Sequence, residues 1–301
     1  MRVKGIGFAT KRPDECDTMK FAQMVCAVSQ NIGDDIQSIA AANRLPRVDL
    51  YLDREQLDAV QGPDPVLMVM NGWFMHSDRW PPSQFLRPIF VGFHVAPNKR
   101  KLIAAHAQYL RRYEPIGTRD KGTADFLNGL GIRAGVTYCL TLTLPSRPKA
   151  PANGKVIIVD AGEIKIPSTV RRNAVKLTNE FFFFPGLREA TKLQYARELI
   201  EFYRDTASLI ITTRLHCALP CVAMGIPVVF FGDPADYRTS IVRDIGGTIY
   251  DKRIHGKNVL GRIGQAIDPI DWSPLPLDIT ALKERLLQEV STRIEAVEAS
   301  R

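Results

Sequence analysis

Residues 208–231, SLIITTRLHCALPCVAMGIPVVFF, decide the fold more directly than any other stretch of the chain. An apolar run leads straight into Thr213, Arg214, Leu215 and His216, and an apolar helical pattern and a second apolar run follow. A strand that passes directly into a helix leaves first-turn N–H groups unpaired beyond the carboxyl edge of a parallel sheet. With an arginine and an imidazole beside them, the junction predicts an anion-binding site that also supplies a proton. The alternative is that Arg214 pairs with a neighbouring element and His216 is merely packed.

Composition limits the class of protein. The chain has 301 residues, 45% of them hydrophobic and 24% charged, which is ordinary globular composition and long enough for two domains. Its net charge of +8 is spread over short clusters without a basic tail, so nucleic acid is not an expected partner. A basic surface suits phosphorylated donors, anionic polysaccharide, or the anionic face of a membrane that carries a lipid-linked acceptor.

Cysteine and histidine usage points to a reducing compartment and to no metal. The five cysteines form no Cys-x-x-Cys pair, so a cytoplasmic location is expected. No run of about eighteen apolar residues occurs, so neither a membrane span nor secretion is predicted. The five histidines are not clustered at metal-ligand spacing, so no metal is expected.

Apolar runs alternate with helical periods, which is typical of parallel sheets covered by helices. Residues 146–154, SRPKAPANG, are the best linker candidate, so we expect an N-terminal α/β domain over 1–148 and a C-terminal one over 149–301. The last helix, capped by Asp278, has apolar residues at helical spacing and should dock on the core. Two Rossmann-like domains facing across a cleft fit this pattern, with ligands in the cleft.

The expected elements are short. Strands are expected at residues 3–9, 65–70, 88–94, 113–119, 155–160 and 175–178, in addition to the two in the opening stretch. Helices are expected from Asn31 onward, at 98–111, at 123–130 with Gly131 closing it, at 187–204 and after Asp278.

Six motifs, in this order and spacing, resemble the polysaccharide pyruvyltransferase family. They are NIGDDIQSIAA (31–41), DREQL (53–57), MNGWFMH (70–76), PIGTRD (115–120), CLTLTL (139–144) and TRLH (213–216). The resemblance implies a glycosyltransferase-B-like fold of two facing α/β domains. It also implies transfer of pyruvate from phosphoenolpyruvate (PEP) onto two hydroxyls of a sugar, forming a cyclic ketal, in surface polysaccharide or exopolysaccharide biosynthesis. PEP is then a co-substrate, and no cofactor is expected.

A PEP site needs two cationic forks, or one arginine plus a helix start, because PEP carries a phosphate and a carboxylate. Arg214, with Thr213 and Leu215 beside it, is one candidate from the C-terminal domain. Arg119 matches the family's arginine in the Ile-Gly-Thr-Arg-Asp motif and is the second candidate, from the N-terminal domain. Its alternative role is an ion pair with Asp120 or with another nearby carboxylate, that of Asp125.

The reaction also needs acid and base groups, because the vinyl CH2 of PEP gains a proton while a sugar hydroxyl loses one. His216 is the expected proton donor, since imidazole titrates near neutral pH. His94, after a predicted strand, resembles a family position that faces the donor, with a buried core role as the alternative. Asp34 is expected to orient or deprotonate the acceptor, or else to act as a charge at a helix N-terminus.

The acceptor sugar is expected on the N-terminal side of the cleft. Asn31 and Gly33 open the first long helix there, and Asn71, Trp73 and His76 follow a predicted strand. An aromatic ring packs well against the apolar face of a sugar, so Trp73 is either a sugar platform or a core residue. The acceptor partner is then a sugar or a lipid-linked saccharide, which is compatible with peripheral association at the cytoplasmic face of the inner membrane.

The chain departs from the family pattern at one position. Family members tend to carry a histidine after Leu-Thr where this chain has Asn179, which puts the handling of the acceptor in question. The phenylalanines at 181–184 suggest either a packing loop or an interaction site.

Two other functions remain open. A glycosyltransferase of the same fold would hold a nucleotide diphosphate at the Arg214 helix start, although a glycine-rich first turn is missing. A non-catalytic protein that binds anionic sugar would need no titrating histidine beside that arginine. The sequence does not predict the oligomeric state.

Overall fold

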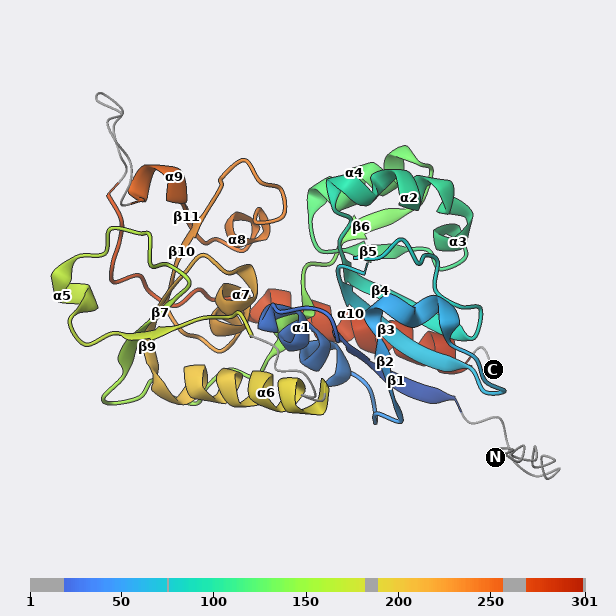
Figure 1. Cartoon of the computed structure of the whole chain (residues 1–301), viewed down its shortest axis with the longest axis horizontal. Helices are drawn as coiled ribbons and strands as arrows, with labels where there is room; N and C mark the ends of the chain where they lie inside the picture. The colour runs from blue at the N-terminus through green and yellow to red at the C-terminus, as the bar shows by residue number, and fades with distance from the viewer. Residues whose placement is uncertain (1–18, 75, 182–188, 257–268, 300–301) are drawn as a thin grey trace, which may run out of the picture.

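The computed structural model describes residues 19–74, 76–181, 189–256 and 269–299, which form a mixed α/β protein with two parallel sheets (Figure 1). This confirms the predicted class of secondary structure. The strand expected at residues 3–9 and the phenylalanines at 182–184 lie outside the described residues.

Among the described residues, the first sheet has six parallel strands in the order β2-β1-β3-β4-β5-β6. They are β1 (Lys20–Val25), β2 (Leu50–Asp53), β3 (Val66–Gly72), β4 (Leu86–Phe93), β5 (Ile116–Thr118) and β6 (Ala134–Val136). Strand β3 is buried along its whole length, which is why it reads as a continuous apolar run. Strands β1 and β2 were not predicted from the sequence, because buried Gln23 interrupts the apolar run of β1, and β2 has only four residues, three half-buried and one exposed.

The second sheet, within the same described ranges, has five parallel strands in the order β11-β10-β9-β7-β8. They are β7 (Lys155–Val159), β8 (Val175–Leu177), β9 (Ala207–Thr212), β10 (Val228–Gly232) and β11 (Ile249–Asp251). The opening stretch of the sequence supplies β9 and β10 at its centre, which confirms the strand-helix-strand prediction.

Helices connect the strands of both sheets. They are α1 (Ile32–Ala42), η1 (Arg54–Ala59), η2 (Pro97–Lys99), α2 (Arg100–Ala105), α3 (Ala107–Arg111), α4 (Lys121–Gly129), η3 (Leu140–Thr143), α5 (Ser168–Arg171), α6 (Glu189–Thr206), α7 (Leu215–Ala223), α8 (Ile241–Asp244), α9 (Lys252–His255) and α10 (Thr280–Ala299). The single helix expected at 98–111 is broken at His106, whose φ of -114° and ψ of 25° leave the helical region. Gly131 has a φ of 70°, as a residue that closes a helix often does.

The middle of the molecule is built by α1, α7 and α10, with the two sheets on either side of them (Figure 1). Helix α1 contacts both α6 and α7, and Lys192 of α6 reaches back to α1 with its Nζ 3.0 Å from Oδ2 of Asp35. The same Nζ donates to the carbonyl oxygens of Cys26 and Ser29. A buried cation thus fixes the loop between β1 and α1 against a helix that belongs to the second sheet.

Helix α10 packs on the first sheet rather than on the second. Its N-terminus is capped by Asp278, whose Oδ1 accepts the Thr280 N–H at 3.0 Å. Its buried residues join the apolar cluster of the first sheet, and they are Leu286, Val290 and Ile294. Arg293 donates from Nη1 to the carbonyl oxygens of Phe90 and Pro115, at 3.0 and 2.6 Å.

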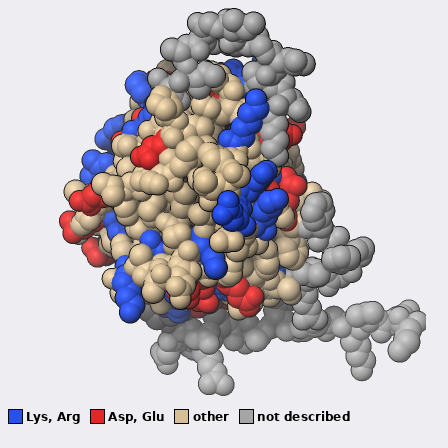
Figure 2. Space-filling model, turned by 90° about the vertical axis from the view of Figure 1, so that its left-hand side faces the viewer, with Lys and Arg blue, Asp and Glu red and all other residues tan. Residues whose placement is uncertain are grey.

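Charge on the surface is mixed. On the face in Figure 2, Lys and Arg side chains are scattered among acidic and uncharged ones. This distribution agrees with the sequence, where the basic residues occur in short clusters.

Candidate functional site

A pocket of about 560 Å³ lies at the carboxyl ends of strands from both sheets. The residues before 150 that line it are Val28, Ser29, Gln30, Asn31, Asp34, Gln37, Trp73, His76, His94, Ala96 and Arg119. The residues after 150 that line it are Glu180, Arg214, His216 and Arg238. Most of the predicted site residues are therefore brought together, although Thr213, Leu215, Gly33 and Asn71 do not line the pocket.

The start of α7 has the free donors that the sequence predicts. Arg214 is the N-cap residue, and its own N–H donates to Oγ1 of Thr212 at 3.0 Å. Thr213 is engaged away from the pocket, since its hydroxyl donates to the carbonyl oxygen of Asp160 at 2.8 Å. The N–H groups of Leu215 and His216 have no hydrogen-bond partner among the described residues. Two amides therefore remain available for an anion.

The guanidinium of Arg214 is held by two carboxylates. Its Nε donates to Oδ2 of Asp160 at 2.7 Å, and its Nη2 pairs with Oε1 of Glu180. The alternative role considered for Arg214, an ion pair with a neighbouring element, is thus present in the structure. An incoming anion would have to compete with both carboxylates.

His216 is buried in the pocket wall, and its Nε2 has no hydrogen-bond partner. Burial, with a further contribution from the charge of Arg119, lowers the pKa of His216 to about 3. The imidazole is therefore neutral near pH 7 when the pocket is empty. Gly33 lies directly behind it, because a Cβ at Gly33 would be only 2.8 Å from the Cβ of His216.

Arg119 differs from Arg214 in having little compensation for its charge. Its side chain is 6% exposed, and its closest ion-pair contact is from Nε to Oδ2 of Asp120 at 3.8 Å. Nε makes no hydrogen bond. Burial lowers the pKa of Arg119. The alternative pairing with Asp125 is wrong, since Asp125 pairs with Lys121 at 2.8 Å on the surface.

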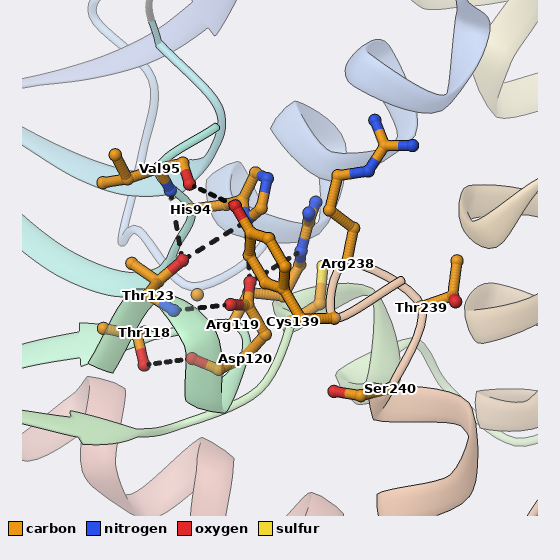
Figure 3. A network of polar contacts seen from close by, with 12 residues as sticks. His94, Val95, Thr118, Arg119, Asp120, Thr123, Cys139, Arg238, Thr239 and Ser240 are labelled. Carbon is orange, nitrogen blue, oxygen red and sulfur yellow. Dashed lines mark hydrogen bonds and ion pairs between the residues drawn. The ribbon is translucent and has the colours of Figure 1, made fainter. Parts of the chain in front are cut away.

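His94 and Asp120 form a buried pair with an Nδ1 to Oδ2 distance of 2.7 Å (Figure 3). Burial opposes the charge of Asp120, but the hydrogen bond from His94 and nearby positive charge outweigh it and lower the carboxyl pKa. Burial and the charge of Arg119 lower the pKa of His94 to about 4. The ionised carboxylate therefore accepts a hydrogen bond from the Nδ1–H of a neutral imidazole, which leaves Nε2 as a base.

Asp120 was considered in the sequence only as a partner of Arg119. Its Oδ1 also caps α4 by accepting the N–H of Thr123 at 2.8 Å. An aspartate three residues before a threonine at a predicted helix start is a recognisable cap signal. The pairing with His94 joins residues 26 positions apart, so no local signal announces it.

Asp34 lines the pocket as a firmly ionised carboxylate. Its Oδ2 accepts hydrogen bonds from Ser29 Oγ at 2.6 Å and from Arg54 Nη1 at 2.9 Å. Burial opposes its charge, yet the fully buried Arg54 outweighs it and lowers the pKa of Asp34. A low pKa suits a group that orients a hydroxyl better than one that removes its proton. Arg54 was quoted in the motif DREQL but was not predicted as a site residue.

The predicted acceptor residues fall into two groups. Asn31, Trp73 and His76 line the pocket, with the rings of Trp73 and His76 4.2 Å apart in an edge-on arrangement. Asn71 is completely buried instead, where its Oδ1 accepts the N–H of Leu140 at 3.1 Å. Asn71 therefore connects β3 to η3 rather than lining the pocket. Gly33 does not line the pocket either, and its lack of a side chain allows His216 to pack closely against α1.

Asn179 holds two segments together. Its carbonyl oxygen accepts the N–H of Ile32 at 2.8 Å, and its Oδ1 accepts the hydroxyl of Tyr203 at 3.1 Å. It is fully buried and does not line the pocket. This position in the chain therefore anchors the start of α1.

In the part of the chain that the structure describes, no three histidine, cysteine or acidic side chains gather as a metal site would require. In the same ranges, no helix is long and apolar enough to span a membrane.

These features define a class of protein: a parallel α/β protein whose pocket combines a buried arginine, the start of a helix and two neutral imidazoles. The model of the polysaccharide pyruvyl transferase family matches residues 31–233, more than half of the chain. The chain therefore belongs to the polysaccharide pyruvyl transferase family, as the motifs predict.

Similarity to solved structures is weaker. A functionally uncharacterized protein from Klebsiella pneumoniae subsp. pneumoniae NTUH-K2044 is 12% identical, with 77% of this chain and 91% of that chain covered and a TM-score of 0.46. A protein described as a UDP-N-acetylglucosamine 2-epimerase from Listeria monocytogenes is 10% identical, with 93% and 88% covered and a TM-score of 0.42. No curated protein matches the chain.

Proposed function

We propose that this protein transfers the pyruvyl group of PEP onto two hydroxyls of a sugar, forming a ketal in surface polysaccharide or exopolysaccharide biosynthesis. The observation that carries the proposal is the buried guanidinium of Arg119, whose Nε contact to the Asp120 carboxylate is as long as 3.8 Å. A buried cation with so weak a partner is costly unless an anion binds beside it. The start of α7 supplies a second anion contact, since His216, one of the two residues with a free amide there, lines the same pocket.

The two neutral imidazoles suit the proton transfers of this reaction. His94, oriented by Asp120, takes the proton of the attacking hydroxyl at Nε2, so that the hydroxyl oxygen bonds to C2 of PEP. His216 delivers a proton to the vinyl CH2, which becomes the methyl group. It acquires that proton only when the negative charge of PEP offsets Arg119 and raises the pKa of the imidazole.

The second half of the reaction releases phosphate. The bond between C2 and the phosphate oxygen breaks, and the oxygen keeps the electron pair. A second hydroxyl of the same sugar then bonds to C2 and closes the ketal. Of the two hydroxyl protons, one ends on the methyl group and the other on the released phosphate, so the transfer is balanced.

On this proposal, the two sheets belong to two Rossmann-like domains that face each other across the pocket, as in a glycosyltransferase-B-like fold. The first domain offers the sugar Asn31, Trp73 and Asp34, and the second offers PEP the start of α7. The acceptor is a sugar or a lipid-linked saccharide. The protein would then act in the cytoplasm, in peripheral contact with the inner membrane when the acceptor is lipid-linked.

The test is to incubate the protein with PEP and a panel of nitrophenyl sugars and lipid-linked saccharides. We expect phosphate release only when an acceptor is present, and an acceptor that gains the mass of a pyruvate ketal. The variant His216→Ala should keep PEP binding and lose turnover. Release of a nucleotide from a nucleotide sugar would favour the glycosyltransferase instead, and saturable sugar binding without turnover would favour the binding protein.

A further inference from the structure

The segment 233–240, which follows β10 of the second sheet, crosses to the first sheet at the pocket mouth. The hydroxyl of Tyr237 donates to the carbonyl oxygen of Val95 at 2.9 Å, and its ring lies 5.7 Å from that of His94. Gly122 leaves room for this ring, because a Cβ there would be 2.5 Å from the Tyr237 ring. The position of Tyr237 is thus fixed by the start of α4 and the end of β4.

The next residue, Arg238, lines the pocket with Arg119. Figure 3 shows both side chains extending in the same general direction, away from β5. Arg238 pairs with a single carboxylate, that of Asp236, at 2.9 Å from Nε and 2.8 Å from Nη2. Its Nη1 has no hydrogen-bond partner among the described residues, and the side chain is 58% exposed.

The three arginines of the pocket differ in how easily they can take up a new anion. Arg214 is held by two carboxylates, at least one of them well shielded from solvent. Arg238 is itself 58% exposed and pairs with one carboxylate two residues away, that of Asp236, whose side chain is 22% exposed; pairs that include an exposed member contribute only about 0–1 kcal/mol. Breaking the ion pair with Asp236 so that Arg238 can bind a ligand therefore costs little free energy.

We propose that Arg238 binds the second anionic group of PEP, and that Tyr237 is the residue that positions it. PEP carries two anionic groups on a short frame, and a second guanidinium at the pocket would let the protein hold both at once. Arg119 and the α7 amides take the inner group, and Arg238 takes the group nearer the mouth. This inference rests on the proposed use of PEP.

The test compares Arg238→Ala with Arg253→Ala. Arg253 is the control, because it pairs with Asp251 in the same two-residue arrangement, with a further contact to Asp233 at 3.2 Å, is 61% exposed and does not line the pocket. Calorimetric titrations should use PEP and, separately, inorganic phosphate. We expect Arg238→Ala to weaken PEP binding about tenfold or more, the loss typical of a hydrogen bond between charged groups, and phosphate binding less than about twofold.

Three outcomes would overturn the inference: PEP binding equal in the two variants, equal losses for PEP and phosphate, or a loss confined to the KM of the acceptor. The proposed function can fail separately. If the wild-type protein does not bind PEP at all, the use of PEP is wrong, whereas wild-type binding with an unaffected Arg238→Ala refutes only the role of Arg238.

Tyr237→Phe tests the positioning role, because it removes the hydrogen bond to Val95 and keeps the ring on His94. We expect the KM for PEP to rise about three- to tenfold with kcat little changed, since one hydrogen bond is lost outside the reacting atoms. Tyr250→Phe is the control, because Tyr250 lies in β11, its hydroxyl also takes part in one hydrogen bond to a backbone group, and it does not line the pocket. A three- to tenfold fall in kcat with an unchanged KM for PEP would contradict the positioning role of Tyr237.

Discussion

Arg119 and Arg214 line the same pocket, yet their surroundings are opposite. Arg119 is buried just after the carboxyl end of β5 with one carboxylate contact at 3.8 Å, whereas Arg214 is 32% exposed and bound by two carboxylates. Arg214, which belongs to the most conspicuous sequence motif, thus has its charge more fully neutralised by carboxylates than Arg119 has. A motif fixes where an arginine stands, and the number of carboxylates around it determines how readily it binds a substrate anion.

The largest effect that this comparison predicts is at Arg119. Arg119→Met should weaken PEP binding about a hundredfold, because a buried charge contact is lost. It should leave the melting temperature unchanged or higher, because a poorly compensated buried charge is replaced by an apolar side chain. Calorimetric titration and thermal unfolding measure the two effects. Arg133→Met, at a residue with a 73% exposed side chain, is the control, and a large loss of stability in Arg119→Met would show that the charge is structural.

The next effect concerns pH. Because the pKa of His216 is about 3 in the folded protein and 6.5 in the unfolded chain, the unfolded chain binds more protons between these values. The free energy of unfolding should therefore fall as the pH falls from 6.5 towards 3. Between pH 7 and pH 4, the free energy of unfolding of His216→Asn should fall by about 1–3 kcal/mol less than that of the wild-type protein. Denaturant titration at the two pH values measures the difference. A pH dependence of His216→Asn identical to that of the wild-type protein would contradict the burial of a neutral His216.

A smaller effect is expected at the contact between α1 and α7. Gly33→Ala forces its new Cβ against His216 and should lower kcat about tenfold with little change in PEP binding. Gly129→Ala is the matched control, because a Cβ there meets nothing within 4 Å. Steady-state kinetics on both variants decide the matter. Wild-type kcat in Gly33→Ala would mean that the position of His216 is not critical.

The smallest effect separates the two roles of Arg214. Glu180→Gln removes one of its two carboxylates and should tighten PEP binding about threefold if Arg214 contacts the substrate, as expected for a partly exposed charge pair. Glu163→Gln, at an exposed position outside the pocket, is the control. Unchanged affinity in Glu180→Gln, by isothermal titration, would assign Arg214 to a structural role.

Local patterns predicted the parts of the fold that depend on local physics. The opening stretch gave β9, α7 and β10, and the cap residues Asn31 and Asp278 marked helix starts. Strand β1 was missed because a buried glutamine breaks its apolar run. That glutamine is tolerated because its Nε2 donates to Ser38 Oγ of α1 at 3.1 Å, a contact that no local pattern contains.

The same limit applies to the candidate site: single residues could be predicted from the sequence, but their long-range partners could not. Motifs identified Arg119, His94 and Asp34 individually. The partners that set their charge states were not predicted, since Asp120 and Arg54 act across 26 and 20 positions of the chain. Arg238 gave no signal, because its place in the pocket depends on how segment 233–240 crosses to the first sheet.

The docking of α10 links the order of synthesis to folding. The first sheet ends with β6 at Val136, yet its apolar cluster includes Leu286, Val290 and Ile294. A nascent chain that stops short of residue 280 would expose that apolar face to water and leave two carbonyl oxygens without the guanidinium of Arg293. The first sheet to be translated is therefore among the last to be completed, and chaperones have the longest time to bind it.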